Sequence, residues 1–100
     1  MKTFVLAGLL ASTLAFADEV VTQKDKAFAP GDITVKAGQR VTFVNDDTVA
    51  HNVFSKDAKF NLKIQPPGDK QSVSFDTPGT YEVRCAIHPK MTLKVKVVAP

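Results

Sequence analysis

Residues 80–97 have the sequence TYEVRCAIHPKMTLKVKV, in which two alternating segments flank a short loop. Apolar and polar residues alternate in 80–85 and again in 92–97, which is the pattern of a β-strand with one buried face. Cys85 falls on the apolar face of the first segment, so we expect its thiol to point toward the core at the strand end. This stretch therefore predicts two strands joined by a tight loop.

The loop holds an unusual set of side chains. Cys85, His88 and Met91 are spaced three residues apart, and Cys85 is the only cysteine of the chain. Because proline disfavours helical backbone at the preceding residue, Pro89 predicts that the loop stays extended or bent at His88. The other histidine, His51, lies on a different predicted strand. One thiolate, two imidazoles and a weak thioether are the ligands of a blue-copper site, so these four residues are candidate ligands.

The rest of the chain has the same strand pattern. Further strands are predicted at residues 32–36, 40–45 and 72–75, with short ones at 19–22 and 51–54. Turn-forming residues separate them, at Pro30-Gly31, Ala37-Gly38, Asn45-Asp46-Asp47, Pro66-Pro67-Gly68-Asp69 and Pro78-Gly79. Many short strands with regular turns predict an all-β fold, an antiparallel sandwich or barrel. Residues 55–65 fit either a loop or a helix with lysines along one face.

The N-terminus has the features of a signal peptide. Lys2 precedes a largely apolar run over 4–14, and Ala15-Phe16-Ala17 is a small-x-small cleavage site. We expect 1–17 to be removed, which leaves 18–100 as one small domain exported to the periplasm. The apolar run is too short to span a bilayer, so no membrane anchor is expected. The alternative is a cytosolic protein with an apolar N-terminus.

Charge and cysteine content exclude other classes. Removal of Lys2 from the 13 basic residues leaves a net charge of +2 against 10 acidic residues, and no basic stripe with aromatics is present. Nucleic acid is therefore not an expected partner. A single cysteine permits no internal disulfide. A bound metal would protect this thiol in an oxidising compartment and would add binding free energy to folding.

These motifs together resemble the cupredoxins, and most closely the small bacterial members similar to amicyanin and plastocyanin. The matching segments are 35–38 (VKAG), 41–45 (VTFVN), 51–53 (HNV), 78–85 (PGTYEVRC), 88–89 (HP) and Met91. The resemblance covers nearly all of the mature chain. It implies a Greek-key β-sandwich or barrel. The sequence departs from the amicyanin pattern at Ala50, where a proline is frequent, and at Thr92 directly after Met91.

The resemblance also implies a site with one copper ion per chain. His51, Cys85 and His88 would be the equatorial ligands and Met91 the axial one. The backbone N–H of Asn52 would donate to the Cys85 sulfur, and the Asn52 side chain would tie the two ligand segments together. Such contacts orient metal ligands and tune the metal.

Each candidate ligand also has an ordinary structural interpretation. Cys85 could be a small buried hydrophobe, His88 a surface residue beside a turn, His51 a structural histidine and Met91 core packing. A zinc site would more often hold several cysteines. Cysteine-nucleophile catalysis would need an open cleft beside a base, which nothing in the sequence suggests, so we do not expect an enzyme.

The resulting hypothesis is a periplasmic, monomeric type 1 copper protein that carries single electrons between redox partners. A cytochrome, a dehydrogenase or an oxidase would dock transiently on an apolar patch at His88, Ile87, Pro89 and the Pro66-Pro67 turn, steered by Lys90. The alternative is a copper-delivery protein without a redox partner. A third interpretation is a metal-free β-sandwich interaction module.

Overall fold

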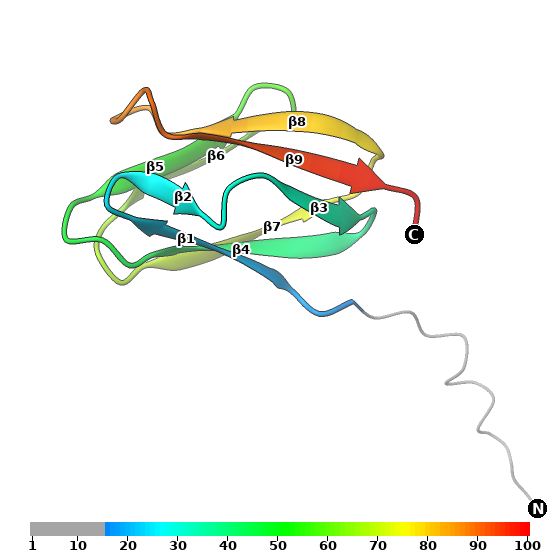
Figure 1. The fold of residues 1–100 in the computed structure, drawn as a ribbon, viewed down its shortest axis with the longest axis horizontal. Coiled ribbons are helices and arrows are strands. Elements are labelled where there is room, and N and C mark those ends of the chain that lie inside the picture. Colours follow the sequence, from blue (N-terminus) through cyan, green and yellow to red (C-terminus); the bar gives the residue numbers. More distant parts are fainter. Residues whose placement is uncertain (1–15) are drawn as a thin grey trace, which may run out of the picture.

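The computed structural model describes residues 16–100, which form strands and turns (Figure 1). The strands are β1 (Glu19–Lys24), β2 (Ala27–Ala29), β3 (Ile33–Lys36), β4 (Gln39–Asn45), β5 (His51–Ser55), β6 (Phe60–Gln65), β7 (Lys70–Phe75), β8 (Gly79–Arg84) and β9 (Thr92–Val98). Among these described residues there is no helix, and hence none that could cross a membrane. All but the last two residues of the predicted signal peptide, 1–17, lie outside the described range.

The strands form two sheets that pack face to face (Figure 1). One sheet has the order β2-β1-β4-β7, and the other has the order β3-β9-β8-β5-β6. The predicted all-β sandwich is thus confirmed. The sheets are mixed, however, because β1 pairs with β4 and β3 pairs with β9 in parallel. Parallel partners need a crossover connection. Between β1 and β4 the chain crosses to the other sheet after β2 and returns after β3, and between β3 and β9 it changes sheet after β3, β4, β6 and β7.

The core lies between the sheets and follows the predicted alternation. Val21, Val41 and Phe43 are fully buried on one sheet, and Val83 and Val95 are fully buried on the other. Intervening residues on β3 and β9 are exposed, so each strand presents one apolar face inward. The seven strands predicted from alternation are all present, with ends that differ by a few residues.

The segment at 55–65 is neither the loop nor the helix considered from the sequence. Phe60–Gln65 forms β6, which pairs antiparallel with β5. A β-bulge places two residues of β6 opposite Val53, and Lys63 in the bulge has a positive φ of 65°. The bulge reverses the side-chain alternation, so that Ile64 is 57% exposed while Gln65 is fully buried. The residues FNLKIQ of 60–65 do alternate between apolar and polar, so the pattern is compatible with a strand, but it could not reveal that the bulge turns Ile64 outward and Gln65 inward.

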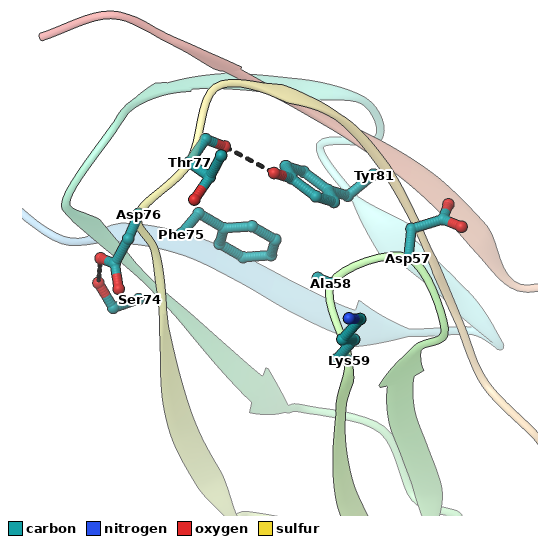
Figure 2. Close-up of a pocket in the computed structure, with 8 residues that line it drawn as sticks. All are labelled: Asp57, Ala58, Lys59, Ser74, Phe75, Asp76, Thr77 and Tyr81. Atoms are coloured by element: carbon teal, nitrogen blue, oxygen red, sulfur yellow. Dashed lines mark hydrogen bonds between the residues drawn. The ribbon is translucent and has the colours of Figure 1, made fainter.

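The end of the sandwich where β8 begins is closed by a tyrosine. The Tyr81 hydroxyl donates to the Thr77 carbonyl at 2.7 Å, as Figure 2 shows. This contact pins the connection from β7 to β8 in the manner of a tyrosine corner. Gly79 has φ of 152°, and a Cβ there would lie 3.3 Å from the Tyr81 hydroxyl, so both the backbone conformation and the close contact favour glycine. A hollow of about 310 Å³ beside Tyr81 is lined by residues of the β5–β6 turn and the β7–β8 connection (Figure 2).

Two neighbouring valines of β1 test which face is buried. Val21 is fully buried and Val20 is 52% exposed. We expect Val21→Ala to lower the free energy of unfolding by about 2 kcal/mol, since it removes buried apolar surface, and Val20→Ala to change it by less than about 0.5 kcal/mol. Urea unfolding of both variants measures the difference. Equal losses would contradict the observed orientation of β1.

Candidate metal centre

Three metal-binding side chains meet at the end of the sandwich opposite to Tyr81. His51 is the first residue of β5, Cys85 directly follows β8, and His88 lies in the loop between β8 and β9. The side chains of His51 and Cys85 are buried, with relative exposures of 0% and 1%, and His88 is half-buried. Residues far apart in the sequence are therefore held together by two neighbouring strands of one sheet.

The three side chains direct one donor atom each toward a common point. The Nδ1 atoms of His51 and His88 lie 3.1 Å apart, and the Cys85 Sγ lies 3.9 Å and 3.8 Å from them, respectively. The point equidistant from atoms at these separations lies about 2.1 Å from each, while metal bonds to imidazole nitrogen and thiolate sulfur are about 2.0–2.3 Å. The triangle is thus the right size to hold one metal ion without rearrangement.

The loop that carries His88 is closed by its own backbone. The Met91 N–H donates to the His88 carbonyl at 2.8 Å, and the Cys85 N–H donates to the Met91 carbonyl at 3.2 Å. The chain bends at His88 and turns through Pro89, so the predicted non-helical connection is confirmed. Met91 is 2% exposed and lies at the base of this loop. These bonds fix the backbone of the three loop residues relative to one another.

Asn52 joins the two segments that bear the donor atoms. Its backbone N–H donates to the Cys85 Sγ at 3.3 Å, and its side-chain oxygen accepts from the Ala86 N–H at 3.1 Å. Its side-chain amide donates to the Lys63 carbonyl at 2.8 Å and to the Asn61 side chain at 2.9 Å. The two contacts expected from the sequence are both present. The β6 bulge therefore also contributes to the support of the site, because Lys63 is the bulge residue.

Asp47 also belongs to the site, although it was not among the residues predicted from the sequence. The Nε2 atom of His51 lies 2.9 Å from the Asp47 Oδ2, so the ring contacts a carboxylate on the side opposite to its Nδ1. The same oxygen accepts from the Lys26 N–H at 2.9 Å, and Oδ1 accepts from the Thr48 N–H at 2.8 Å. The Lys26 N–H, the His51 ring and the Thr48 N–H together hold the pKa of the Asp47 carboxyl well below its usual range.

The available signal was the position of Asp47, four residues before His51. Asp47 lies in the run Asn45-Asp46-Asp47, which has the composition of a turn. A role in the turn alone explains an aspartate there, so the sequence did not indicate the contact with His51. The structure shows both functions. The Asp47 N–H donates to the Asn45 side chain at 2.9 Å, as in an Asx turn, while its carboxylate reaches His51.

Buried amide side chains hold this turn from beneath. Asn45, Gln23 and Gln65 are all fully buried. The Asn45 amide donates to the carbonyls of Val49 and Gln65 at 3.0 Å and 2.8 Å, and the Gln23 amide donates to the Gln65 side chain at 2.9 Å. Because buried polar groups are costly unless they are hydrogen-bonded, these contacts favour a single arrangement of the turn.

The chemistry of the donors fits copper. A thiolate and imidazoles suit soft and borderline transition metals, whereas magnesium and calcium prefer oxygen. The converging atoms are one sulfur and two nitrogens, and the one nearby carboxylate, that of Asp47, contacts the far side of the His51 ring. A structural zinc site would usually have four nitrogen or sulfur ligands drawn from cysteine and histidine, and the described cluster has three.

Comparison with known proteins agrees with this geometry. A family described as the cupredoxin-like domain matches residues 3–99. Amicyanin-alpha of Methylorubrum extorquens is 36% identical over 84 residues, which cover 79% of this chain and 70% of the relative. The chloroplastic plastocyanin of Physcomitrium patens is 38% identical over 78 residues, which cover 67% of this chain. That match spans 46% of the plastocyanin, so the chain covers about half of this relative.

The fold agrees as well. The structure of a Cu(I) form of an amicyanin variant superposes with a TM-score of 0.75 and 26% sequence identity, covering 88% of this chain and 89% of the amicyanin. The β-sandwich, the geometry of the site and the family match all indicate the same family. The chain belongs to the cupredoxin-like domain family.

Proposed function

We propose that this chain is a type 1 copper protein that carries single electrons, with His51, Cys85, His88 and Met91 holding one copper ion. The observation that carries the proposal is the convergence of the Cys85 sulfur with the two histidine Nδ1 atoms, all within 4 Å of one another. A bound copper ion would supply a one-electron Cu(II)/Cu(I) couple. Met91, buried beside these residues, is the proposed weak axial ligand.

The protein scaffold contributes rigidity. The donor atoms lie at separations that suit one metal ion, and the Asn52 N–H donates to the Cys85 sulfur. A site that is fixed in this way needs little rearrangement when its charge changes, which favours rapid electron transfer. The hydrogen bond to the sulfur also withdraws electron density from the thiolate and so contributes to the reduction potential.

Electrons would enter and leave through His88. This residue is half-buried and borders a mostly apolar hollow of about 450 Å³. The hollow is lined by Lys26, Ile87, His88, Pro89, Lys90 and Met91. Ile87 is 44% exposed, which provides apolar surface beside the ring. Pro66 and Pro67, which the sequence placed in the same patch, are exposed but are not among the lining residues.

The proposed partner is another redox protein that docks on this hollow transiently. Small apolar interfaces suit short-lived electron-transfer complexes. Lys26 and Lys90 place two positive charges at its edge, which would attract a partner with acidic groups around its own redox centre. A cytochrome, a dehydrogenase or an oxidase could fill this role. We further propose that the chain acts as a monomer in the periplasm after removal of 1–17.

Copper delivery without a redox partner is the second candidate. His88 is half-buried at the hollow, so a competing chelator could reach this ligand. An electron carrier should retain copper during dialysis against a moderate chelator, because its ligands are held in place. A delivery protein should release it.

The proposed copper site predicts a spectrum that depends on the Cys85 thiolate. Cu(II) added to the mature protein should give an intense sulfur-to-copper absorption band in the visible range and a narrow copper hyperfine splitting in the EPR spectrum. Cys85→Ser should abolish both features, because the serine oxygen cannot replace the thiolate in this charge transfer. A pale spectrum with ordinary tetragonal copper in the unsubstituted protein would refute the proposed site.

The proposed docking surface predicts that the charges of Lys26 and Lys90 affect the rate of electron transfer. With the copper protein reduced, oxidation by the anion hexacyanoferrate(III) at low salt should be slowed about threefold or more by Lys26→Glu and by Lys90→Glu, since charge steers association. The cation tris(phenanthroline)cobalt(III) should react faster with both variants. High salt should reduce both effects.

Lys96→Glu is the matched control for this experiment. Lys96 is an exposed residue of β9 that pairs with Thr80 near the start of β8, away from the hollow. It carries the same change in net charge. If Lys96→Glu alters the rates as much as the two substitutions at the hollow, electrons do not pass preferentially through the His88 surface.

A further inference from the structure

We infer that Asp47 is a positioning residue that commits His51 to binding metal through Nδ1 and places a fixed negative charge behind that ligand. The inference rests on the proposed function, since the ligand and the metal are those of the proposed copper site. It concerns a residue that touches the ligand and not the metal.

The first step is the orientation of the His51 ring. His51 is fully buried, its Nε2 lies 2.9 Å from the Asp47 Oδ2, and its Nδ1 faces the other donor atoms. A carboxylate only accepts hydrogen bonds, so the proton of a neutral ring must be on Nε2. The Nδ1 lone pair is then free to bind a metal. Asp47 thus selects the tautomer that the site needs.

The second step is the fixed position of the carboxylate. Besides the His51 ring, Asp47 accepts from the N–H groups of Lys26 and Thr48, and its side chain is only 10% exposed. Lys26 lies in the tight turn between β1 and β2, where both Asp25 and Lys26 have positive φ. The Lys26 N–H therefore reaches Asp47 from the β1–β2 hairpin, which is separate from the turn that contains Asp47. Three donors from three parts of the chain hold the carboxylate against the ring.

The third step is a difference between the two histidines. In the range 16–100 the Nε2 of His88 makes no hydrogen bond, and the ring borders the hollow. His51 alone has a carboxylate behind it. The anionic partner makes the His51 nitrogen more basic and favours the more highly charged state of a metal bound to it. Asp47 should therefore favour Cu(II) over Cu(I).

Asp47→Asn tests this inference in the copper-loaded chain. The amide keeps the size of the side chain and one acceptor oxygen but removes the charge. We expect the Cu(II)/Cu(I) ratio at a fixed applied potential to fall about tenfold, which corresponds to a potential higher by 59 mV for one electron. A spectroelectrochemical titration of the visible band measures the ratio.

Asp46→Asn is the matched control, because it removes the same charge from the adjacent, exposed residue. It should change the ratio by less than about twofold, since solvent screens its charge. An unchanged ratio in Asp47→Asn, or equal changes in both variants, would overturn the inference.

A measurement on the metal-free protein keeps the inference separable from the proposed function. Nitrogen-15 NMR of the neutral His51 ring should show a protonated Nε2 and an unprotonated Nδ1. In Asp47→Asn the two tautomers should both be populated. A His51 ring protonated on Nδ1 in the unsubstituted protein would refute the positioning role even if copper binds. Conversely, failure to form the blue site with the expected tautomer present would refute only the proposed function.

Discussion

The relative positions of the His51 and Cys85 donor atoms depend on the contact between Asn52 and the segment that follows β8. Strands β5 and β8 are paired at only one position, Phe54 with Arg84, before they reach the site. Beyond that point two other hydrogen bonds take the place of backbone pairing between the strands. The Asn52 N–H donates to the Cys85 sulfur, and the Ala86 N–H donates to the Asn52 side-chain oxygen. The strands can therefore separate enough to admit a metal ion and still keep their donor atoms in register. Without these two hydrogen bonds, the end of β5 that bears His51 and the segment that bears Cys85 would be connected only through the pairing of Phe54 with Arg84.

The polar groups around the site have a common physical logic. A buried thiol, imidazole, carboxylate and several amides would destabilise a small domain if they lacked partners. Here Asn45, Gln65 and Asp47 each make more than one side-chain hydrogen bond, and most of their partners are backbone groups. The apolar core between the sheets stabilises the sandwich, and the hydrogen-bonded end gives it a unique local geometry. Stability and preorganisation thus come from different parts of one small domain.

Much of this could be predicted from the sequence, because alternation fixes which way a side chain points. The parity of Cys85 in residues 80–85 predicted a buried thiol, and Pro89 predicted the bend that brings His88 back. Three features could not be predicted in this way. The β6 bulge reverses the alternation at Lys63. Gln65 therefore faces the core, although the apolar Ile64 would be expected there from the sequence pattern. Asp47 acts across space on His51 while its local sequence indicates a turn. Parallel pairing of β1 with β4 likewise depends on the path between sheets and leaves no local pattern.

Lys26 serves the protein twice, with different parts of the same residue. Its main-chain N–H supports Asp47, and its side chain borders the hollow beside His88. Every residue except proline has that N–H, whereas the side chain decides the charge at the rim. A substitution at this position can therefore change the charge at the rim of the hollow and still keep the hydrogen bond to Asp47, which contacts the His51 ring. The positive φ of 56° limits the choice toward glycine, asparagine and aspartate, so the easiest evolutionary steps remove or reverse the positive charge.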